Sequence, residues 1–257
     1  MTKRFQCDQL DVSIHPTRQS MGLAAGEAFL KVIKTKLKYQ NQVRVIFAAA
    51  PSQAEFLDYL AKDREIDWRR VIAFHMDEYL GLPQASEASF GHFLDVHLFN
   101  HLPFGQVYYI DPTHQDPTQE THYYSQLLRE EPIDIVAMGI GENGHIAFND
   151  PPVADFKDPH WVKTVELDEI CRQQQVNDGA FPSLEAVPTT AITLTIPALL
   201  SAKEIVCVVP GPTKQQAVKD TLEGPISTTC PASILRKHEA AKLFLDEEAA
   251  ILLESGF

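Results

Sequence analysis

Short apolar runs that alternate with helical patterns constrain the fold of this chain more than any other feature. The runs are Val43–Ala50, Val71–Met76, Ile133–Ile140, Ala191–Ile196, Glu204–Val209 and Lys242–Leu245. Continuous runs of this length, rich in β-branched residues, are typical of strands buried on both faces of a parallel sheet. The helical patterns are Ser20–Leu37, Gln53–Ala61, Ser89–His101, Thr118–Arg129, Thr213–Leu222 and Ala232–Lys237. The alternation predicts an α/β fold with a Rossmann-like, doubly wound, mainly parallel sheet.

The chain has 257 residues, of which 44% are hydrophobic, so it can bury a sizeable core. No internal repeat or Gly/Ser linker divides it, which predicts a single domain over residues 1–257. The least regular stretch is Asp150–Pro188, which contains five prolines and one helical pattern over Asp168–Gln175. A long excursion inside a compact domain is often a lid over a site. We therefore expect residues 151–188 to form a lid, with a surface insertion without a role as the alternative.

Charge limits the partners of the chain. It carries 22 Lys and Arg against 35 Asp and Glu, a net charge of −13. Such an acidic surface repels nucleic acid and anionic membranes, although a few cations and backbone N–H groups can still hold a phosphate. No window has the ~18 consecutive apolar residues of a membrane span, and Met1–Val12 has no apolar core of a signal peptide. Four dispersed cysteines without a CxxC pair favour a reducing, cytoplasmic location.

Polar residues gather where three of the apolar runs end, at Ala48–Gln53, His75–Gly81 and Gly139–Asp150. Ligands of open α/β sheets bind beyond the carboxyl ends of the strands. The third segment contains GxGxxG, the pattern of a dinucleotide site. That pattern must open a helix, but here Pro151 and Pro152 follow within a few residues. We therefore predict that its glycines permit a tight turn close to a ligand, and that no nicotinamide cofactor binds there.

His145 and Asp150 share this glycine-rich segment, and Asp77 and Glu78 end the preceding run. Carboxylates and a histidine that converge at strand ends are suited to proton transfer. The alternative is structural: Asp77 caps a turn and His145 fills a hydrogen bond. Elsewhere, His97 and His101 have the i, i+4 spacing of metal ligands, but the Glu of an HExxH motif is missing. The sequence thus predicts an enzyme site without a metal.

Two of these motifs resemble a known family. Met76-Asp77-Glu78-Tyr79 with Gly81-Leu82, and GIGENGHIAFND over Gly139–Asp150, are similar to the glucosamine-6-phosphate deaminase (isomerase) family. The resemblance extends from about Val43 to Glu247. It implies a Rossmann-like fold and the conversion of glucosamine 6-phosphate and water to fructose 6-phosphate and ammonia, with no metal and no cofactor.

The resemblance also implies roles for individual residues. Asp77 matches the general base that moves a proton between C2 and C1, and His145 matches the histidine that assists ring opening. Asp150 stands where the family usually has Glu, and Asn143 where many members have Asp. Because Asp is one CH₂ shorter than Glu, we expect His145 to be oriented differently, for example through a bridging water. Lys214 matches a lysine that binds the phosphate.

Other positions depart from the family's pattern. The segment Ala48–Ala50 replaces a glycine-containing phosphate loop, although Ser52 still offers a hydroxyl and an N–H group. A further phosphate-binding arginine is replaced within Gln173–Gln175, beside Arg172. The phosphate pocket is therefore expected to hold fewer cations than is typical. The substrate contacts predicted from all these patterns are Ser52, Glu78, Gly141, Gly144, Arg172 and Lys214.

The leading interpretation is a sugar-phosphate aldose–ketose isomerase and deaminase whose partner is a phosphorylated small sugar. A 6-phosphogluconolactonase-type hydrolase is the first alternative, although those enzymes resemble GHxASLFP after the glycines and this chain reads Gly144-His145-Ile146-Ala147-Phe148. An isomerase that releases no ammonia, and a sugar-phosphate sensor without turnover, also stay open. The sequence leaves open the hexosamine epimer, any allosteric effector and whether the chain forms a homo-oligomer.

Overall fold

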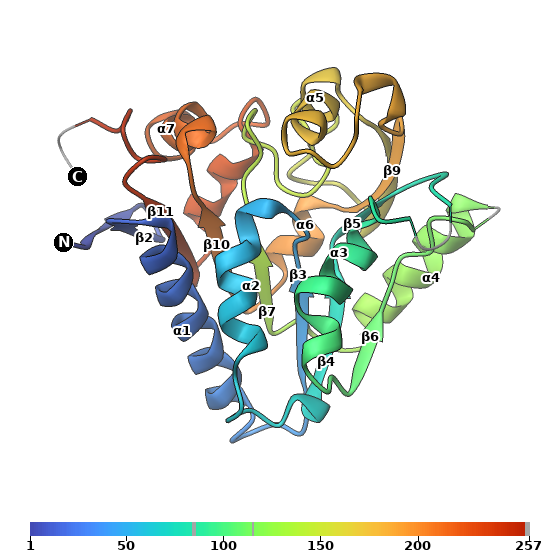
Figure 1. Ribbon diagram of the computed structural model, residues 1–257, viewed down its shortest axis with the longest axis horizontal. Helices are drawn as coiled ribbons and strands as arrows, with labels where there is room; N and C mark the ends of the chain where they lie inside the picture. Colours follow the sequence, from blue (N-terminus) through green and yellow to red (C-terminus); the bar gives the residue numbers. More distant parts are fainter. Residues whose placement is uncertain (84–85, 115, 255–257) are drawn as a thin grey trace.

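The structure is a computed structural model that describes residues 1–83, 86–114 and 116–254. Within these residues, eight strands form the central sheet: β1 (Lys3–Cys7), β2 (Leu10–His15), β3 (Val43–Phe47), β4 (Val71–His75), β6 (Gln106–Tyr108), β7 (Ile135–Met138), β10 (Glu204–Val209) and β11 (Ala241–Asp246). Their order is β1-β2-β11-β10-β7-β3-β4-β6 (Figure 1). β1 and β2 pair antiparallel, and every other neighbouring pair is parallel.

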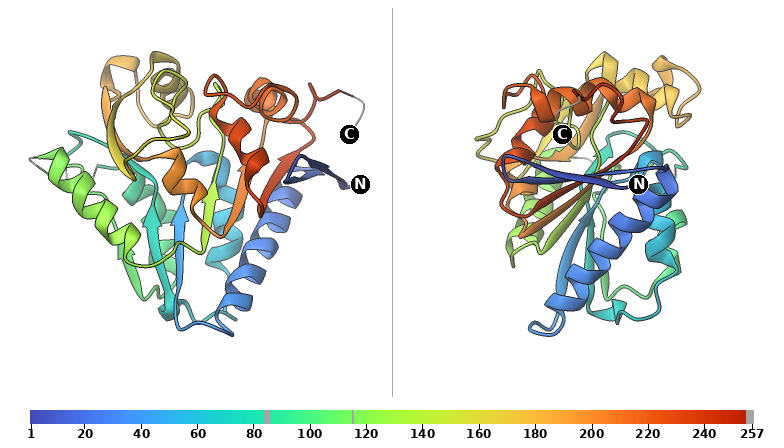
Figure 2. Two further views of the ribbon diagram at one scale, coloured as in Figure 1. Left: turned by 180° about the vertical axis from the view of Figure 1, so that it is seen from behind. Right: turned by 90° about the vertical axis from the view of Figure 1, so that its left-hand side faces the viewer.

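Helices cover both faces of this sheet (Figure 2). One face packs against α1 (Arg18–Lys36), α2 (Ala54–Ala61) and α3 (Phe90–His97), and the other against α4 (Pro117–Arg129), α6 (Ile196–Leu200) and α7 (Gln215–Glu223). Successive side chains of a strand point to opposite faces. In β7, Ile135 and Ala137 accordingly pack in the core between the sheet and α1, α2 and α3. Val136 and Met138 pack in the core between the sheet and α4, α6 and α7. The predicted Rossmann-like, doubly wound, mainly parallel sheet is confirmed.

A second sheet has three antiparallel strands: β5 (Asp77–Tyr79), β9 (Thr190–Leu194) and β8 (Val162–Glu166), in that order. The run Ala191–Ile196 was expected to join the parallel sheet, and that prediction is wrong. β9 is nonetheless buried over residues 191–194. A continuous apolar run shows only that a strand is covered on both faces, so it does not reveal which sheet the strand joins.

The segment predicted as a lid is more ordered than the sequence suggested. Residues 151–188 contain β8, α5 (Glu169–Asn177) and a 3₁₀ turn at Leu184–Ala186. Asp168 caps α5, because its side chain accepts a hydrogen bond from the N–H of Ile170 at 2.8 Å. A small separate core joins this segment to the rest of the chain; it includes Tyr79, Phe148, Val165, Cys171 and Phe181.

Some helix bounds also differ from the prediction. The helix expected over Ser89–His101 ends at His97, and Phe99–His101 form a separate 3₁₀ turn. The segment Pro231–Lys237 is likewise 3₁₀. The N-terminal hairpin of β1 and β2 was missed, although Leu10, Val12 and Ile14 of β2 alternate with polar residues. No helix in the described part of the chain is long and apolar enough to cross a membrane.

Candidate active site

The winding of the central sheet changes direction between β3 and β7. From β3 the chain continues outward to β4 and β6, and it then returns to β7, β10 and β11 on the other side. Ligands of doubly wound folds bind at this point, beyond the carboxyl ends of the strands. A cavity lies there, between the sheet and α5, with a free volume of about 70 Å³. It is lined by Ala48, Ala49, Ala50, Ser52, Met76, Asp77, Phe90, Gly139, Ile140, Gly141, His145, Ala147, Phe148, Gln174, Gln175, Asp178 and Lys214.

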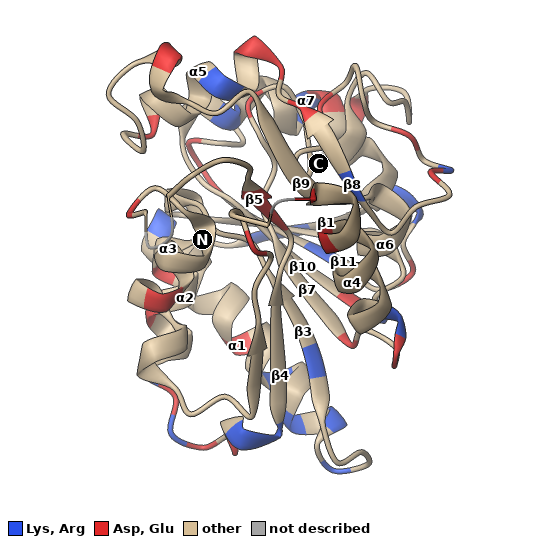
Figure 3. Ribbon diagram, turned by 90° about the vertical axis from the view of Figure 1, so that its right-hand side faces the viewer, with Lys and Arg blue, Asp and Glu red and all other residues tan. Residues whose placement is uncertain are grey.

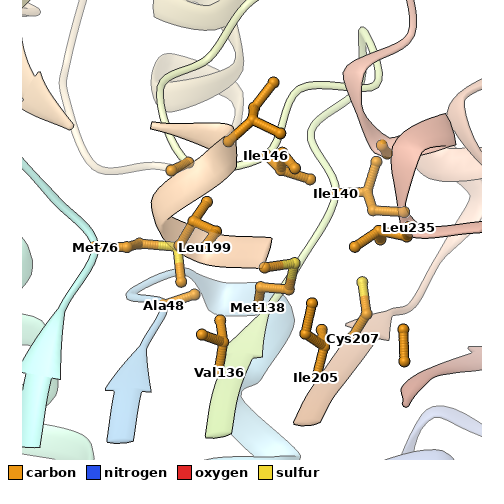
Figure 4. Close-up of a cluster of buried hydrophobic side chains, with 14 of the residues drawn as sticks. Ala48, Met76, Val136, Met138, Ile140, Ile146, Leu199, Ile205, Cys207 and Leu235 are labelled. Carbon is orange, nitrogen blue, oxygen red and sulfur yellow. The ribbon is translucent and has the colours of Figure 1, made fainter. Parts of the chain in front are cut away.

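A packed hydrophobic cluster surrounds the ends of β3, β4 and β7 (Figure 4). Ala48, Met76 and Ile140 belong both to the cluster and to the cavity lining. They follow β3, β4 and β7, respectively. The three strand ends from which the polar residues emerge are therefore held in place by close packing.

Residues Gly139–Asp150, here called the glycine-rich loop, form tight turns and open no helix, as expected from the two prolines that follow them. Gly141 lies against the imidazole of His145 so closely that a Cβ at position 141 would overlap the ring. Gly144 has φ +82, and a Cβ there would be 2.7 Å from Sγ of Cys230. Ala147 also adopts a positive φ of 49. The loop thus has a strained conformation that holds His145 in the cavity wall.

His145 is oriented by two neighbours. Its Nδ1 lies 2.8 Å from Oδ1 of Asn143 and 2.9 Å from Oδ1 of Asp150. Asn143 in turn donates from Nδ2 to Oδ1 of Asp150 at 2.8 Å. Because both atoms that face Nδ1 are acceptors, Nδ1 carries a proton and Nε2 is the free nitrogen of the neutral ring. The prediction that the shorter acid reaches His145 through water is wrong, since the carboxylate contacts the ring directly.

Asp150 itself is 1% exposed and does not line the cavity. Burial pushes the pKa of its carboxyl upward. The hydrogen bond and charge of His145, with contributions from Asn143 and Cys171, outweigh burial and hold the pKa below its ordinary value. A carboxylate that stays ionised behind the ring favours protonated His145 during a reaction.

Asp77 begins β5, beside the loop, and faces the cavity. Figure 3 shows the acidic residues of β5 in the interior, between α5 and the central sheet. Burial, and to a lesser extent the charge of Glu78, raises the pKa of Asp77 well above its ordinary value. Among the described residues, no group donates a hydrogen bond to its carboxylate. A buried carboxylate without donors is a strong base for a substrate proton.

Glu78 has a structural position. Its carboxylate accepts hydrogen bonds from the N–H groups of Tyr79, Phe90 and Gly91 at 3.0–3.1 Å, the last two at the N-terminus of α3. Burial raises its pKa to about 7, against the effect of these three donors. Glu78 does not line the cavity, although it was predicted to contact the substrate.

The cavity lining also includes a group that is suited to bind an anion. Lys214, at the start of α7, is 7% exposed and lines the cavity together with Ser52. Burial lowers its pKa, and Asp178, Glu142 and Cys171 act in the opposite direction. No ion pair engages Lys214 within the described part of the chain. A buried, unpaired ammonium group that faces a cavity can bind a phosphate.

Arg172 does not reach the cavity. Its guanidinium donates to the carbonyl oxygens of Leu184 and Val187 at 2.7 and 3.0 Å, within residues 151–188. Gln174, Gln175 and Asp178 of the α5 region line the cavity instead. From the sequence, Gln173–Gln175 were named only as the place of a lost arginine, and Asp178 was not named. With Cys171, the three lining residues follow i, i+3, i+4 and i+7, the spacing of one helix face. This spacing could have indicated a helix face that points into the cavity. It was overlooked because most residues at these positions are polar, and a buried helix face is usually recognised by apolar residues.

The structure thus brings Ser52, Asp77, Gly141, His145 and Lys214 together around one cavity. Asn143 and Asp150 lie behind His145 and orient it. Gly144, which was predicted to contact the substrate, packs against Cys230 and does not line the cavity. Glu78 and Arg172 hold backbone groups of α3 and of residues 151–188.

Comparisons with known proteins identify the family of the chain. Residues 16–244 match the family described as glucosamine-6-phosphate isomerases/6-phosphogluconolactonase. Glucosamine-6-phosphate deaminase of Exiguobacterium sibiricum is 41% identical over 192 residues, which cover 75% of this chain and 74% of that protein. Glucosamine-6-phosphate deaminase of Bacillus thuringiensis is 36% identical over 226 residues, which cover 88% and 84%.

Solved structures are similar over nearly the whole chain. A monomeric glucosamine-6-phosphate deaminase has a TM-score of 0.87 at 28% identity, with 94% of this chain and 99% of that chain covered. A 6-phosphogluconolactonase from Thermotoga maritima has a TM-score of 0.75 at 18% identity, with 93% and 100% covered. The second likeness is one of fold alone.

Proposed function

This chain belongs to the glucosamine-6-phosphate isomerase/6-phosphogluconolactonase family, and we propose that it is an amino-sugar 6-phosphate isomerase and deaminase. The reaction takes an amino-sugar 6-phosphate and water to a ketose 6-phosphate and ammonia. The observation that carries this proposal is the single cavity with a buried, donor-free carboxylate at Asp77, the free Nε2 of His145, and the unpaired ammonium of Lys214.

His145 acts first, on the closed sugar ring. Ring opening breaks the bond between C1 and the ring oxygen, so that oxygen gains a proton while the hydroxyl on C1 loses one. His145 is in place to transfer this proton through Nε2, since Nδ1 faces Asn143 and Asp150. The ionised Asp150 stabilises the imidazolium that forms in passing.

Asp77 then moves a proton between neighbouring carbons. It takes the proton from C2 of the open chain and returns it to C1. The C1 oxygen gains a proton and the amine nitrogen loses one, so the amino aldehyde is converted through an enolamine to an imine at C2 with a hydroxyl on C1. Water adds to that imine, and ammonia leaves, so C2 becomes the ketone carbon. One carboxylate serves both transfers because the two carbons are adjacent.

Lys214 and Ser52 hold the phosphate, since both line the same cavity. Substrate sites usually have about 300–1,000 Å³, whereas this cavity has about 70 Å³. We propose that residues 151–188 are a lid, and that α5 moves outward to admit the sugar and closes to exclude water. Closure would strengthen Asp77 as a base, because exclusion of water raises its pKa further.

The proposed location is the cytoplasm. All four cysteines, Cys7, Cys171, Cys207 and Cys230, are buried and unpaired, as suits a reducing compartment.

An ammonia-release assay tests the function. Purified protein is incubated with glucosamine 6-phosphate, and both ammonia and ketose 6-phosphate are measured. We expect equal amounts of the two products. Ketose without ammonia would indicate a simple isomerase, hydrolysis of 6-phosphogluconolactone alone would indicate the lactonase activity, and binding without either product would indicate a sensor.

Asp77→Asn is the decisive variant, and Glu78→Gln is its matched control. Loss of the base should lower turnover by about 10²–10⁴-fold while sugar-phosphate binding persists. Glu78→Gln changes the neighbouring acid, which holds α3, and should affect stability more than turnover. Equal losses of turnover in both variants would contradict the assignment of Asp77.

A further inference from the structure

Three metal-ligating side chains meet behind the cavity wall. A ring nitrogen of His145, a carboxylate oxygen of Asp150 and Sγ of Cys171 all lie within 4.8 Å of one another. His145 and Asp150 belong to the glycine-rich loop, and Cys171 belongs to α5. Among the residues that the structure describes, no other three His, Cys, Asp or Glu side chains gather in this way. All three are buried.

One oxygen in this cluster lacks a partner. Oδ1 of Asp150 contacts His145 and Asn143, but Oδ2 is buried and has no hydrogen-bond partner in the described part of the chain. The Cys171 thiol is near enough to interact with this carboxylate, yet it makes no regular hydrogen bond to Oδ2. An unpaired buried carboxylate oxygen is costly. It therefore marks a place where an additional positive group would be stabilised.

The donor set is suited to a thiophilic divalent cation. Thiolate, imidazole and carboxylate are the protein ligands of zinc, at about 2.0–2.3 Å and in tetrahedral geometry. Two such ligands around one ion are about 3.3–3.8 Å apart, so small side-chain rotations bring these three into range. Outer-shell support is already present, since Asn143 contacts both His145 and Asp150.

We propose that Zn²⁺, or a similar thiophilic cation such as Cd²⁺, binds His145, Asp150 and Cys171 and inhibits the enzyme. Three protein ligands leave a fourth position for water. The ion takes the two residues that would open the sugar ring, and it also ties α5 to the glycine-rich loop. The ion is an inhibitor and takes no part in turnover. The inhibition rests on the proposed function, whereas the binding does not.

Binding is tested with Cd²⁺, because a cadmium–thiolate bond absorbs in the near ultraviolet. Metal-free protein is titrated with Cd²⁺, and the absorbance change is followed. We expect one ion per chain with a thiolate band that is absent in Cys171→Ser. Removal of this ligand should weaken Cd²⁺ binding by more than about 100-fold, since loss of outer-shell partners alone costs about 10–100-fold.

Cys7→Ser is the matched control, because Cys7 is also buried and unpaired but donates its thiol hydrogen to the carbonyl of Leu222, far from the cluster. It should keep both the band and the stoichiometry. A band that survives in Cys171→Ser, or no band in the parent at equimolar Cd²⁺, would overturn the proposed site.

Inhibition is measured separately, as ammonia release from glucosamine 6-phosphate with and without Zn²⁺, each variant relative to its own metal-free rate. Stoichiometric Zn²⁺ should abolish most parent activity, a chelator should restore it, and Cys171→Ser should be resistant. Binding without inhibition overturns the inhibitory role. A parent without any ammonia release refutes the proposed function but leaves the Cd²⁺ titration as a full test of the site.

Discussion

The side-chain oxygen of Gln174 accepts a hydrogen bond from the backbone N–H of Glu142 at 2.9 Å. This bond joins α5 of the proposed lid directly to the glycine-rich loop that carries His145. Closure of α5 over the cavity and the shape of that loop are therefore linked by a polar contact between two segments about 30 residues apart in sequence.

Gln174→Ala removes this contact and should weaken the closed state. A net hydrogen bond contributes about 0.5–1.5 kcal/mol, so we expect the apparent affinity for the sugar phosphate to fall by a factor of about 2–12. Steady-state kinetics with glucosamine 6-phosphate measure it as KM. Gln173→Ala is the control, because Gln173 is exposed and bonds to Asn177. If both variants have the same KM, the bond does not hold the lid.

Gly141→Ala should impair catalysis through His145. The added Cβ overlaps the imidazole ring, so the ring must move out of its position between Asn143 and the cavity. Misplacement of a catalytic group by about 1 Å can cost about 10²-fold in rate. We expect kcat to fall by that order while thermal unfolding and phosphate binding change little. Retention of the parent's kcat would mean that the ring need not lie flat on position 141.

The pH profile of the reaction should report Asp77. Since burial raises its pKa, the carboxyl stays protonated, and inactive as a base, at pH values where an ordinary aspartate is ionised. The ratio kcat/KM should therefore increase with pH through a midpoint well above the ordinary value of about 3.9. An acidic limb near 4 would contradict this assignment.

The same raised pKa predicts how stability depends on pH. Between the ordinary pKa and the raised folded-state pKa, Asp77 is ionised in the unfolded chain but protonated in the folded one. The folded state then binds more protons, so its stability decreases as pH increases through this window. The amide side chain in the Asp77→Asn variant does not titrate, so this variant lacks that dependence of stability on pH. Its melting temperature should match the parent's at low pH and exceed it increasingly across the window, as a series of thermal melts would show.

Lys214 and Asp178 should affect phosphate binding in opposite directions. Both line the cavity, and each charge acts on the other. Lys214→Ala removes a charged hydrogen-bond donor, which is worth about 1.5–3 kcal/mol, so affinity for the phosphosugar should fall by a factor of about 12–160. Calorimetric titration with the phosphorylated and unphosphorylated sugar tests this, and the unphosphorylated sugar should be unaffected.

Asp178→Asn removes a carboxylate whose charge acts on Lys214 and should strengthen binding of the phosphosugar, by up to about fivefold for a partly solvated charge pair. Binding of the unphosphorylated sugar serves as the internal control. Weaker phosphosugar binding in this variant would mean that Asp178 positions Lys214 more than it repels the substrate.

Sequence analysis found the site residues that lie within one recognisable segment or directly after an apolar run. His145, Asn143 and Asp150 occupy one loop, and their contacts span at most seven residues. Asp77 follows a strong apolar run. Their positions at neighbouring strand ends followed from the expected parallel sheet, because such ends meet at one edge.

Residues that act across the fold were harder to predict. Gln174 and Asp178 reach the cavity only because β8 and β9 form a second sheet with β5 and carry α5 over the strand ends. Glu78 looked like a partner of Asp77, but successive residues of a strand point to opposite faces, so it turns toward the N-terminus of α3. Arg172 was placed by nearness in sequence, whereas its side chain binds carbonyls of its own segment.

The hydrophobic cluster at the strand ends and the inward face of α5 contribute different residues to the cavity lining. Ala48, Met76 and Ile140 are tied into the core, so changes there would disturb the whole sheet. Cys171 on the inward face of α5 belongs to the small core around Tyr79 and stays fixed. The other three positions of that face, Gln174, Gln175 and Asp178, line the cavity outside both sheets and can be exchanged as a set without loss of the central sheet. A library confined to them is therefore the economical route to new substrate preferences on this scaffold.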